Sequence, residues 1–212
     1  MTALVVTGTD TGIGKTVVSA MLTLALEAVY WKPVQSGAVD GTDAATVAAI
    51  TGLGPDRFIL ERYLLSRPLS PHRAAELDGV EIDLHSLVLP GRTPDGRPLI
   101  VEGAGGLMAP LTRRTLYIDI FQRWGVPTVL CARTALGTIN HALLSIEALR
   151  ARGIPILGIV FVGDEMADTE QIICDFADVK RLGRLPFLPR LTPVTLLEAF
   201  DTEFRRQDFT GR

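Results

Sequence analysis

A glycine-rich stretch, GTDTGIGKT at residues 8–16, holds residue types that bind phosphate. It follows the apolar run ALVV and precedes a segment with helical periodicity. Between a strand and a helix, Gly12 and Gly14 would let backbone N–H groups approach phosphate oxygens, because the free amides and the helix dipole attract anions. Lys15 would reach the β- and γ-phosphates, and Thr16 would place its hydroxyl on Mg²⁺. The stretch predicts a nucleoside-triphosphate site.

The spacing of this stretch differs from the common pattern G-x-x-x-x-G-K-[ST]. That pattern would place glycine at position 9, where this chain has Thr9, with its glycine one place earlier at Gly8. An ordinary glycine turn that caps a helix is the alternative interpretation. The Gly-Lys-Thr tripeptide directly after a β-branched strand disfavours it. The extra residue points away from the common kinases and GTPases.

A second lysine and several carboxylates are placed to complete such a site. Lys32 follows an apolar strand, where a lysine is costly to bury, and its charge would stabilise phosphoryl transfer; a snorkelling lysine at a strand end is the alternative. Glu102, at the end of the strand LIVE, suits Mg²⁺, which proteins bind through one or two carboxylates. Asp43 suits it too, although an acid is also favoured at a helix start. Asp10 is a third candidate.

The order of apolar runs and helical patterns predicts the fold. Strands are expected at 3–8, from 28 to about 33, and at 97–102, 126–132, 154–163 and 179–185, helices at 15–27, 42–52, 138–153, 168–177 and from 193, and an irregular segment at 55–80. This alternation predicts one α/β domain over residues 1–212, with a mostly parallel sheet flanked by helices on both faces. Ligands bind beyond the carboxyl ends of such strands, so the loops that follow them are expected to converge.

Composition excludes several classes of protein. The net charge is −3, with 21 basic and 24 acidic residues, so a nucleic-acid or polybasic membrane surface is not expected. The 47% hydrophobic content suits buried parallel strands, and no stretch reaches the roughly 20 apolar residues of a membrane span, so we expect a cytoplasmic protein. Cys131 and Cys174 are expected to be reduced thiols, and the three histidines form no metal pair.

A second anion site is expected at the start of the helix at 138–153. The segment GTINH places Thr138 and Asn140 there, where the helix N-terminus would attract a substrate carboxylate. Simple N-capping by Thr138 is an equally good interpretation.

Several blocks taken together resemble the dethiobiotin synthetase family: VTGTDTGIGKT, KPVQSG, SPH, VEGAGGLMAPL and LGTINHALLSIEAL, in the family's order over about residues 3–150. The family's loop has the form G-T-D-T-x-x-G-K-T, so the extra residue is a family trait. The resemblance implies a P-loop NTPase fold and an ATP- and Mg²⁺-dependent ligase of biotin biosynthesis. Its substrates would be CO₂ and 7,8-diaminononanoate (7,8-diaminopelargonic acid). A carbamate and a carbamic-phosphoric anhydride would lead to dethiobiotin, ADP and phosphate, in a homodimer with the substrate site near the subunit boundary.

The same resemblance implies roles for individual residues. Lys32 and Lys15 would be catalytic, Thr9, Ser36 and Asn140 would bind substrate, and Thr16, Asp43 and Glu102 would bind the metal. The nucleotide would contact Gly12, Ile13, Gly14, Lys15, Thr16, Val17, Asp43, Glu102, Gly103, Ala104, Gly105, Val162, Gly163, Pro186, Phe187 and Leu188.

The chain departs from the family pattern in three places. The connections between the first helix and YWKPV, and between DLHSL and RPLIVE, are short. Val162 and Gly163 stand near the position where family members often carry an asparagine that reads the nucleotide base. Backbone groups and residues 186–188 would then contact the base.

Three other functions compete with the ligase. An ATPase switch that positions other proteins would carry a signature lysine early in the loop, where this chain has Gly8, Thr9 and Asp10. An amidating enzyme of the cobyrinate type would need a glutamine-hydrolysing domain, for which 212 residues leave no room. A nucleotide-binding module without catalysis is disfavoured because Lys32 and the carboxylates are in place.

Overall fold

The computed structural model describes residues 3–210 and contains a seven-stranded sheet in the order β4-β2-β6-β1-β7-β8-β9. Every neighbouring pair of strands is parallel. The strands are β1 (Ala3–Gly8), β2 (Val29–Trp31), β4 (Phe58–Ile59), β6 (Leu99–Glu102), β7 (Thr128–Arg133), β8 (Ile156–Val162) and β9 (Arg181–Leu185). A second, two-stranded parallel sheet pairs β3 (Val34–Ser36) with β5 (Tyr63–Leu65). The predicted parallel architecture is confirmed.

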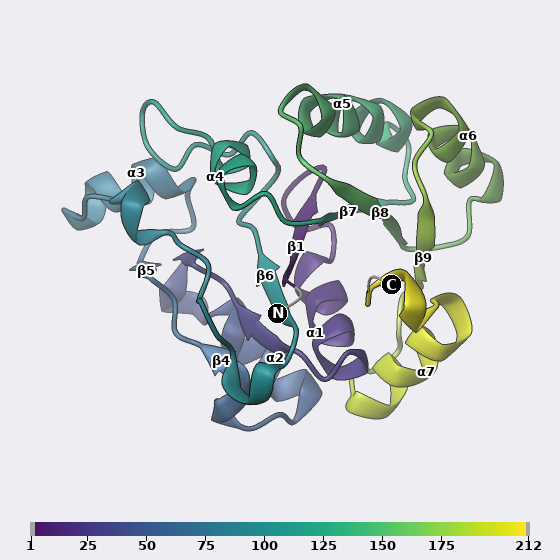
Figure 1. The fold of residues 1–212 in the computed structure, drawn as a ribbon, viewed down its shortest axis with the longest axis horizontal. Helices are drawn as coiled ribbons and strands as arrows, with labels where there is room; N and C mark the ends of the chain where they lie inside the picture. Colours follow the sequence, from purple (N-terminus) through teal and green to yellow (C-terminus); the bar gives the residue numbers. More distant parts are fainter. Residues whose placement is uncertain (1–2, 211–212) are drawn as a thin grey trace.

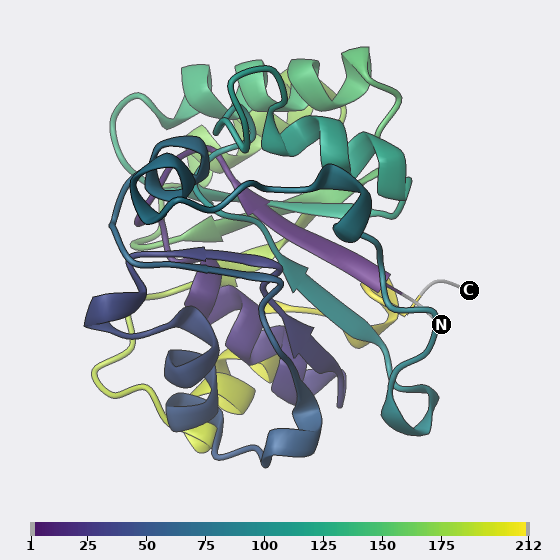
Figure 2. The same ribbon diagram turned by 90° about the vertical axis from the view of Figure 1, so that its left-hand side faces the viewer.

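Helices cover both faces of the large sheet, as Figures 1 and 2 show. The α-helices are α1 (Lys15–Ala25), α2 (Asp43–Thr51), α3 (Pro71–Asp78), α4 (Tyr117–Trp124), α5 (Thr138–Ala151), α6 (Ala167–Ala177) and α7 (Pro193–Glu203). Helices α1, α2 and α7 lie on one face and α4, α5 and α6 on the other. Short 3₁₀ turns occupy Ala38–Asp40, Pro55–Arg57, Leu84–Ser86, Pro94–Gly96 and Arg206–Asp208. None of these helices, all within residues 3–210, is long and apolar enough to cross a membrane.

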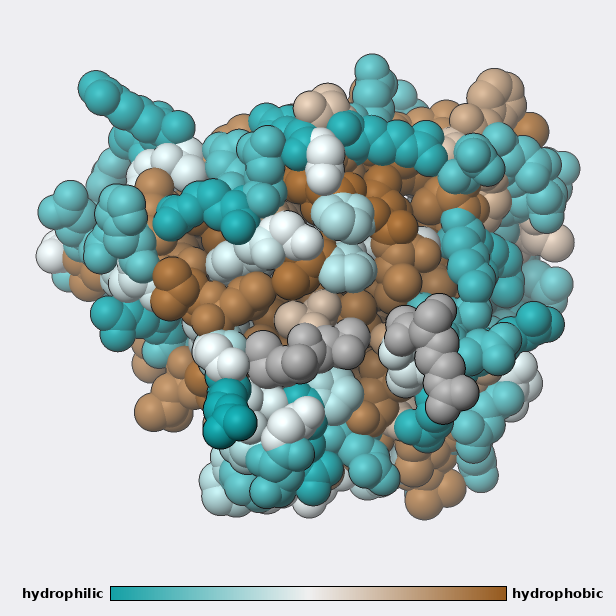
Figure 3. All heavy atoms as spheres, in the orientation of Figure 1, coloured by the Kyte–Doolittle hydropathy of each residue, from teal (hydrophilic) through white to brown (hydrophobic). Residues whose placement is uncertain are grey.

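The strands are buried on both faces, which explains their continuous apolar sequences. In β1 all six residues are buried. Leu4 and Val6 pack toward α1 and α7, and Ala3 and Val5 pack toward α4, because side chains alternate along a strand. On the face shown in Figure 3, hydrophobic residues gather toward the centre and hydrophilic ones around the periphery.

The strand expected from residue 28 to about Pro33 is observed as β2, which ends at Trp31, whereas the three-residue β3 beyond Pro33 was not predicted. Pro33 divides the segment into β2, which joins the large sheet, and β3, which pairs with β5. Proline has no N–H to donate to a ladder, so a strand ends where it stands. The Pro33 carbonyl instead accepts hydrogen bonds from the amides of Arg62 and Tyr63. The break leaves Lys32 at the end of β2.

The expectation of an irregular segment at 55–80 is wrong, because it contains β4, β5 and α3. Its two strands are only two and three residues long and find partners in β2 and β3, far away in sequence. Helix α4 was not predicted at all. Its buried residues Tyr117, Ile118, Ile120 and Phe121 form one apolar face, and Gly125 ends it.

The sheet order places β1 between β6 and β7, so the connections leave this strand in both directions. Open α/β sheets bind ligands at such a switch point, beyond the carboxyl ends of the strands. Lys15 lies in the segment after β1, Lys32 directly follows β2, and Glu102 is the last residue of β6. The fold therefore brings the predicted chemical groups to one edge.

Candidate active site

The phosphate-binding loop connects β1 to α1. Gly14 is the N-cap of α1 in a left-handed conformation (φ +96°), and no side chain caps the helix, so its first amides face outward. Gly12 also has a positive φ of +69°, a conformation that costs other residues about 1 kcal/mol or more. A Cβ atom on Gly14 would lie 2.9 Å from Val162 Cγ1. The loop combines free helix amides with a backbone that only glycine adopts readily.

Lys15 is buried at the start of α1, and its ammonium donates a 2.8 Å hydrogen bond to the carbonyl of Asp10. Burial lowers the pKa of Lys15 below its ordinary value. The Asp10 carboxylate accepts a hydrogen bond from the Thr11 amide. The two hydrogen bonds of Asp10 fix the conformation of the loop and hold the Lys15 ammonium beside it. A phosphate that binds in the loop can replace the Asp10 carbonyl as the hydrogen-bond acceptor of Lys15.

Lys32 lies between two carboxylates. Its ammonium forms ion pairs with Asp43 and, at 3.1 Å, with Glu102 Oε1. Burial alone would lower the pKa of Lys32, but the charges of Glu102 and Asp43 outweigh it and the pKa is raised. Lys32 is therefore a buried, charged ammonium, and the alternative of a snorkelling lysine is wrong for this position.

Asp43 begins α2, and both of its predicted roles are compatible with the geometry. Thr42 is the N-cap, and its side chain accepts a hydrogen bond from the Ala45 amide. Because Thr42 caps the helix, the Asp43 carboxylate is available to form the ion pair with Lys32. The backbone amide of Asp43 donates a 2.9 Å hydrogen bond to the side-chain oxygen of Gln35. Gln35 also donates to the Ser36 carbonyl at 2.7 Å. Gln35, which the sequence analysis missed, thus links the β3 backbone to the start of α2.

Glu102 is fully buried and receives hydrogen bonds on both oxygens. Oε1 accepts from the Thr16 hydroxyl at 3.0 Å and from Lys32, and Oε2 accepts from the Tyr30 hydroxyl at 3.0 Å. Tyr30 was also missed from the sequence, although it precedes Lys32 by two strand positions and so points to the same face. Burial, with the Glu102 charge, raises the pKa of Tyr30, so the phenol remains a donor.

The predicted Mg²⁺ ligands Thr16, Asp43 and Glu102 come together around Lys32. Two carboxylates and a hydroxyl are hard oxygen donors, and they fit Mg²⁺, which takes its remaining ligands from phosphates and water. Within residues 3–210 no group of three or more His, Cys, Asp or Glu could hold a metal by itself. The donor set fits a metal that arrives with a nucleotide.

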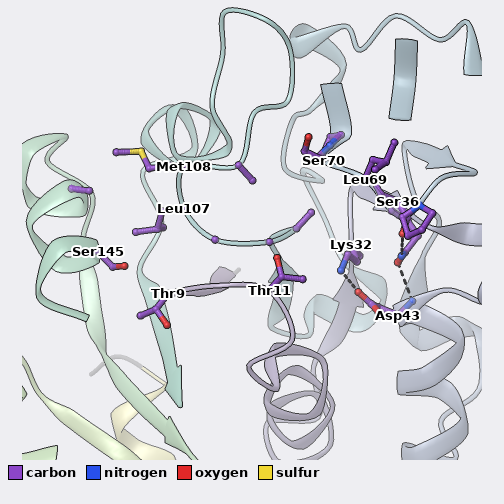
Figure 4. Close-up of a pocket in the computed structure, with 18 of the residues that line it drawn as sticks. Thr9, Thr11, Lys32, Ser36, Asp43, Leu69, Ser70, Leu107, Met108 and Ser145 are labelled. Carbon is purple, nitrogen blue, oxygen red and sulfur yellow. Dashed lines mark hydrogen bonds and ion pairs between the residues drawn. The ribbon is translucent and has the colours of Figure 1, made fainter. Parts of the chain in front are cut away.

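A cavity of about 960 Å³ opens beside this cluster. Figure 4 shows Lys32, Ser36 and Asp43 on one side of it and Thr9 and Ser145 on the other. The Ser36 hydroxyl is buried and has no hydrogen-bond partner among the described residues. The lining residues that the sequence analysis did not single out are Thr11, Gln35, Pro68, Leu69, Ser70, Pro71, Gly106, Leu107, Met108, Ala109, Leu144, Ser145 and Ala148.

The loop after β6 forms one wall of the cavity. Ala104 and Gly105 line it, whereas Gly103 lies deeper, where a Cβ would come within 2.8 Å of the Phe121 ring. Helix α4 fixes the loop, because the amides of Tyr117 and Ile118 donate to the carbonyls of residues 109 and 107. The unpredicted helix therefore supports the wall.

The residues predicted to contact the base lie on the β8 side of the loop. Val162 packs against Gly14, and a Cβ on Gly163 would come within 3.5 Å of the Phe187 ring. Phe187 is 74% exposed, and Pro186 and Leu188 are half-buried beside it. The remaining predicted nucleotide contacts, Ile13 and Val17, are buried and half-buried, respectively, next to the core that α1 covers.

Asn140 does not join the other predicted residues. It is exposed on the first turn of α5 and does not line the cavity of its own chain. Thr138 does not cap α5, because the N-cap is Gly137 and no side chain caps this helix. The Thr138 hydroxyl is buried without a hydrogen-bond partner among residues 3–210. The interpretation of Thr138 as a simple cap is wrong.

The family profile described as AAA domain matches residues 2–195. The ATP-dependent dethiobiotin synthetase BioD of Rhodopseudomonas palustris (strain TIE-1) is 61% identical over 208 residues, or 98% of this chain and 97% of that protein. The protein of the same name from Novosphingobium aromaticivorans is 57% identical over 209 residues, or 99% of this chain and all of that protein.

Solved structures with the same fold are far less similar in sequence. The cell division ATPase MinD of Pyrococcus furiosus has a TM-score of 0.53 and 15% identity, over 95% of this chain and 99% of that one. The septum site-determining protein MinD of Pyrococcus horikoshii, complexed with Mg-ADP, has a TM-score of 0.53 and 13% identity, over 93% of this chain and 86% of that one. At these identities the likeness shows the P-loop NTPase fold alone.

Proposed function

This chain belongs to the dethiobiotin synthetase family of ATP-dependent ligases in biotin biosynthesis, and we propose that it closes the cyclic urea of dethiobiotin. The substrates are 7,8-diaminononanoate, CO₂ and ATP. One amine adds to CO₂ and releases a proton, giving a carbamate. A carbamate oxygen attacks the γ-phosphorus and ADP leaves. The second amine then attacks the carbamoyl carbon of the carbamic-phosphoric anhydride, and phosphate and a proton leave as the ring closes.

The observation that carries this proposal is the position of Lys32. It lines the cavity beside Ser36 and Asp43, and its ion pair with Glu102 connects it to Thr16 in the phosphate-binding loop. A carbamate and a triphosphate are both anions, and their approach needs a fixed positive charge between them. The neighbouring carboxylates raise the pKa of Lys32 and keep it charged. Positioning and charge neutralisation supply most of the catalysis in phosphoryl transfer.

Different residues around the cavity would bind the phosphates, the metal and the diamine. The amides of residues 12–17 and the Lys15 ammonium hold the phosphates. Thr16, Asp43 and Glu102 would hold Mg²⁺, which supplies charge neutralisation at the phosphate oxygens when bound. Thr9 and Ser36, whose hydroxyl has no hydrogen-bond partner within residues 3–210, line the cavity and would offer hydrogen bonds to the diamine or its carbamate.

We propose a homodimer with the diamine site near the subunit boundary. The loop before α5 and the exposed side of α5 carry the apolar residues Leu136, Ile139 and Leu144, and Leu144 also lines the cavity. Apolar side chains gathered at the rim of a binding site favour a protein interface there. In such a dimer Asn140, which lies outside its own cavity, would serve the diamine site of the partner subunit. The site's need for ATP is consistent with the cytoplasm as its location.

The proposal is tested by phosphate release from ATP, Mg²⁺ and bicarbonate, with and without the diamine. We expect release that depends on the diamine, at least a hundredfold slower in Lys32→Ala, with nucleotide binding retained. The matched control is Lys180→Ala, because Lys180 is an exposed lysine paired with Asp208 on another part of the chain. Equal release without diamine, or full activity of Lys32→Ala, would favour an ATPase of the switch type instead.

A further inference from the structure

The Tyr30 hydroxyl is a buried polar group whose only hydrogen bond in the described structure is to a predicted metal ligand. Tyr30 lies in β2 opposite Ile100 of β6, so its side chain and that of Glu102, two positions farther along, share one face of the sheet. The Phe58 ring packs edge-on against the Tyr30 ring, with 6.0 Å between the centroids. The phenol is thus held in place from two sides.

A phenylalanine at position 30 would fill the same space without a polar atom. A buried hydroxyl is costly unless it is hydrogen-bonded, and the group that satisfies this one is Glu102 Oε2. The other oxygen of Glu102 accepts from Thr16 and Lys32. Because the Tyr30 hydroxyl holds Oε2, the carboxylate of Glu102 cannot rotate freely. Oε1 therefore stays directed at Thr16 and Lys32.

We propose that Tyr30 is a positioning residue for the Mg²⁺-nucleotide site and orients Glu102 toward Thr16 and the bound metal. The inference rests on the proposed function in so far as Glu102 is a metal ligand. Tyr30 does not line the cavity, so it would act only through Glu102. Its role is to make metal-dependent nucleotide binding tight.

The test compares Tyr30→Phe with the wild type by calorimetric binding of a non-hydrolysable ATP analogue, with saturating Mg²⁺ and with EDTA. We expect affinity about five- to tenfold weaker with Mg²⁺, the scale of one hydrogen bond, and unchanged with EDTA. Half-saturating Mg²⁺ rises by a similar factor. The matched control is Tyr63→Phe, which loses a hydroxyl bonded to the Asp83 amide and Ser86, away from Glu102.

A double-mutant cycle separates positioning from packing. In a Glu102→Gln background, Tyr30→Phe should have no further effect on Mg²⁺-dependent affinity, because the group it orients has lost its charge. The proposal is overturned if Tyr30→Phe weakens binding equally with and without Mg²⁺, if its Mg²⁺ dependence equals that of the wild type, or if wild-type binding ignores Mg²⁺. Intact Mg²⁺-dependent binding without diamine-dependent phosphate release would instead contradict only the ligase function.

Discussion

The hydroxyl of Thr16 donates a 3.0 Å hydrogen bond to Oε1 of Glu102, across 86 positions of sequence. Thr16 lies in the first turn of α1, directly after the phosphate-binding loop, and Glu102 is the last residue of β6. Because β1 and β6 are neighbouring parallel strands, their carboxyl ends lie side by side and bring these groups together. This contact joins the phosphate-binding half of the site to the half that holds Lys32.

Replacement of Thr16 by valine should weaken Mg²⁺ binding and so raise the Mg²⁺ concentration that the protein requires. Valine keeps the shape of threonine and removes the hydroxyl that donates to Glu102 and that, in the proposed site, would bind the metal. We expect at least a tenfold rise in half-saturating Mg²⁺ for phosphate release, and near wild-type behaviour for Thr16→Ser. Thr202→Val, on an exposed part of α7, is the matched control. An unchanged Mg²⁺ requirement in Thr16→Val would contradict the metal assignment.

Ser36→Ala should affect the diamine and leave ATP binding unchanged. The Ser36 hydroxyl has no partner among the described residues, so its removal costs no internal hydrogen bond, and thermal stability should stay the same or rise slightly. The KM for the diamine should rise about five- to tenfold, as expected for one lost hydrogen bond. Steady-state kinetics with each substrate varied in turn checks this. A higher KM for ATP alone would assign Ser36 to the nucleotide.

Gly14→Ala should damage both stability and nucleotide binding. The left-handed conformation of Gly14 costs alanine about 1 kcal/mol, and its Cβ would also press on Val162. Chemical denaturation and calorimetry measure the two effects. Adding Val162→Ala should relieve the contact and recover only part of the stability. Gly91→Ala should be close to neutral, because a Cβ there meets no atom of the described part of the chain within 4 Å.

The Glu76 carboxylate should make stability depend on acid pH. Hydrogen bonds from Arg113 and Arg73 lower the pKa of Glu76 to about 2 from 4.5. The unfolded chain therefore binds more protons between these values, so this stabilising contribution is present above pH 4.5 and lost as pH falls toward 2. The difference in unfolding free energy between the wild type and Glu76→Gln should shrink over that range. Glu147→Gln is the control, and a difference that does not change with pH would contradict the role of the charge.

The proposed dimer predicts a mass in solution of twice the chain's 22.9 kDa. Leu136→Asp should give a monomer by light scattering, because a charge is costly in an apolar interface. Diamine-dependent turnover should fall with it while nucleotide binding survives. Phe176→Asp, on the exposed side of α6, should leave the dimer intact. A monomeric wild type with full activity would rule out the shared site.

The sequence was sufficient to predict the parallel architecture, the dethiobiotin synthetase family and the grouping of Thr16, Lys32, Asp43 and Glu102, and the comparisons and the fold confirm the first two. Residues at the carboxyl ends of parallel strands meet whatever their separation in sequence, which made that grouping predictable. Tyr30 and Gln35 were missed because an aromatic residue and an amide within an apolar strand resemble core and edge residues. Only their partners, Glu102 and Asp43, reveal their roles.

The errors in the fold have a related cause. Strands β4 and β5 contain two and three residues, too few for a periodic signal, and they exist because β2 and β3 pair with them. Helix α4 contains only eight residues, about two turns, and it was overlooked although its buried residues Tyr117, Ile118, Ile120 and Phe121 follow helical spacing. Residues 68–71, which follow β5, line the cavity, and α4 holds the loop after β6 that forms one of its walls. The cavity-lining residues that were missed therefore depend on the strands and the helix that were missed.

The most direct test of the central claim follows the carbon of bicarbonate. The wild-type protein is incubated with carbon-13 bicarbonate, the diamine, ATP and Mg²⁺, and the products are analysed by mass spectrometry alongside phosphate release. The account predicts dethiobiotin carrying the label in its urea carbon, with one ADP and one phosphate formed for each ring closed, and almost none in Lys32→Ala. Release of phosphate without incorporation of the label would contradict it.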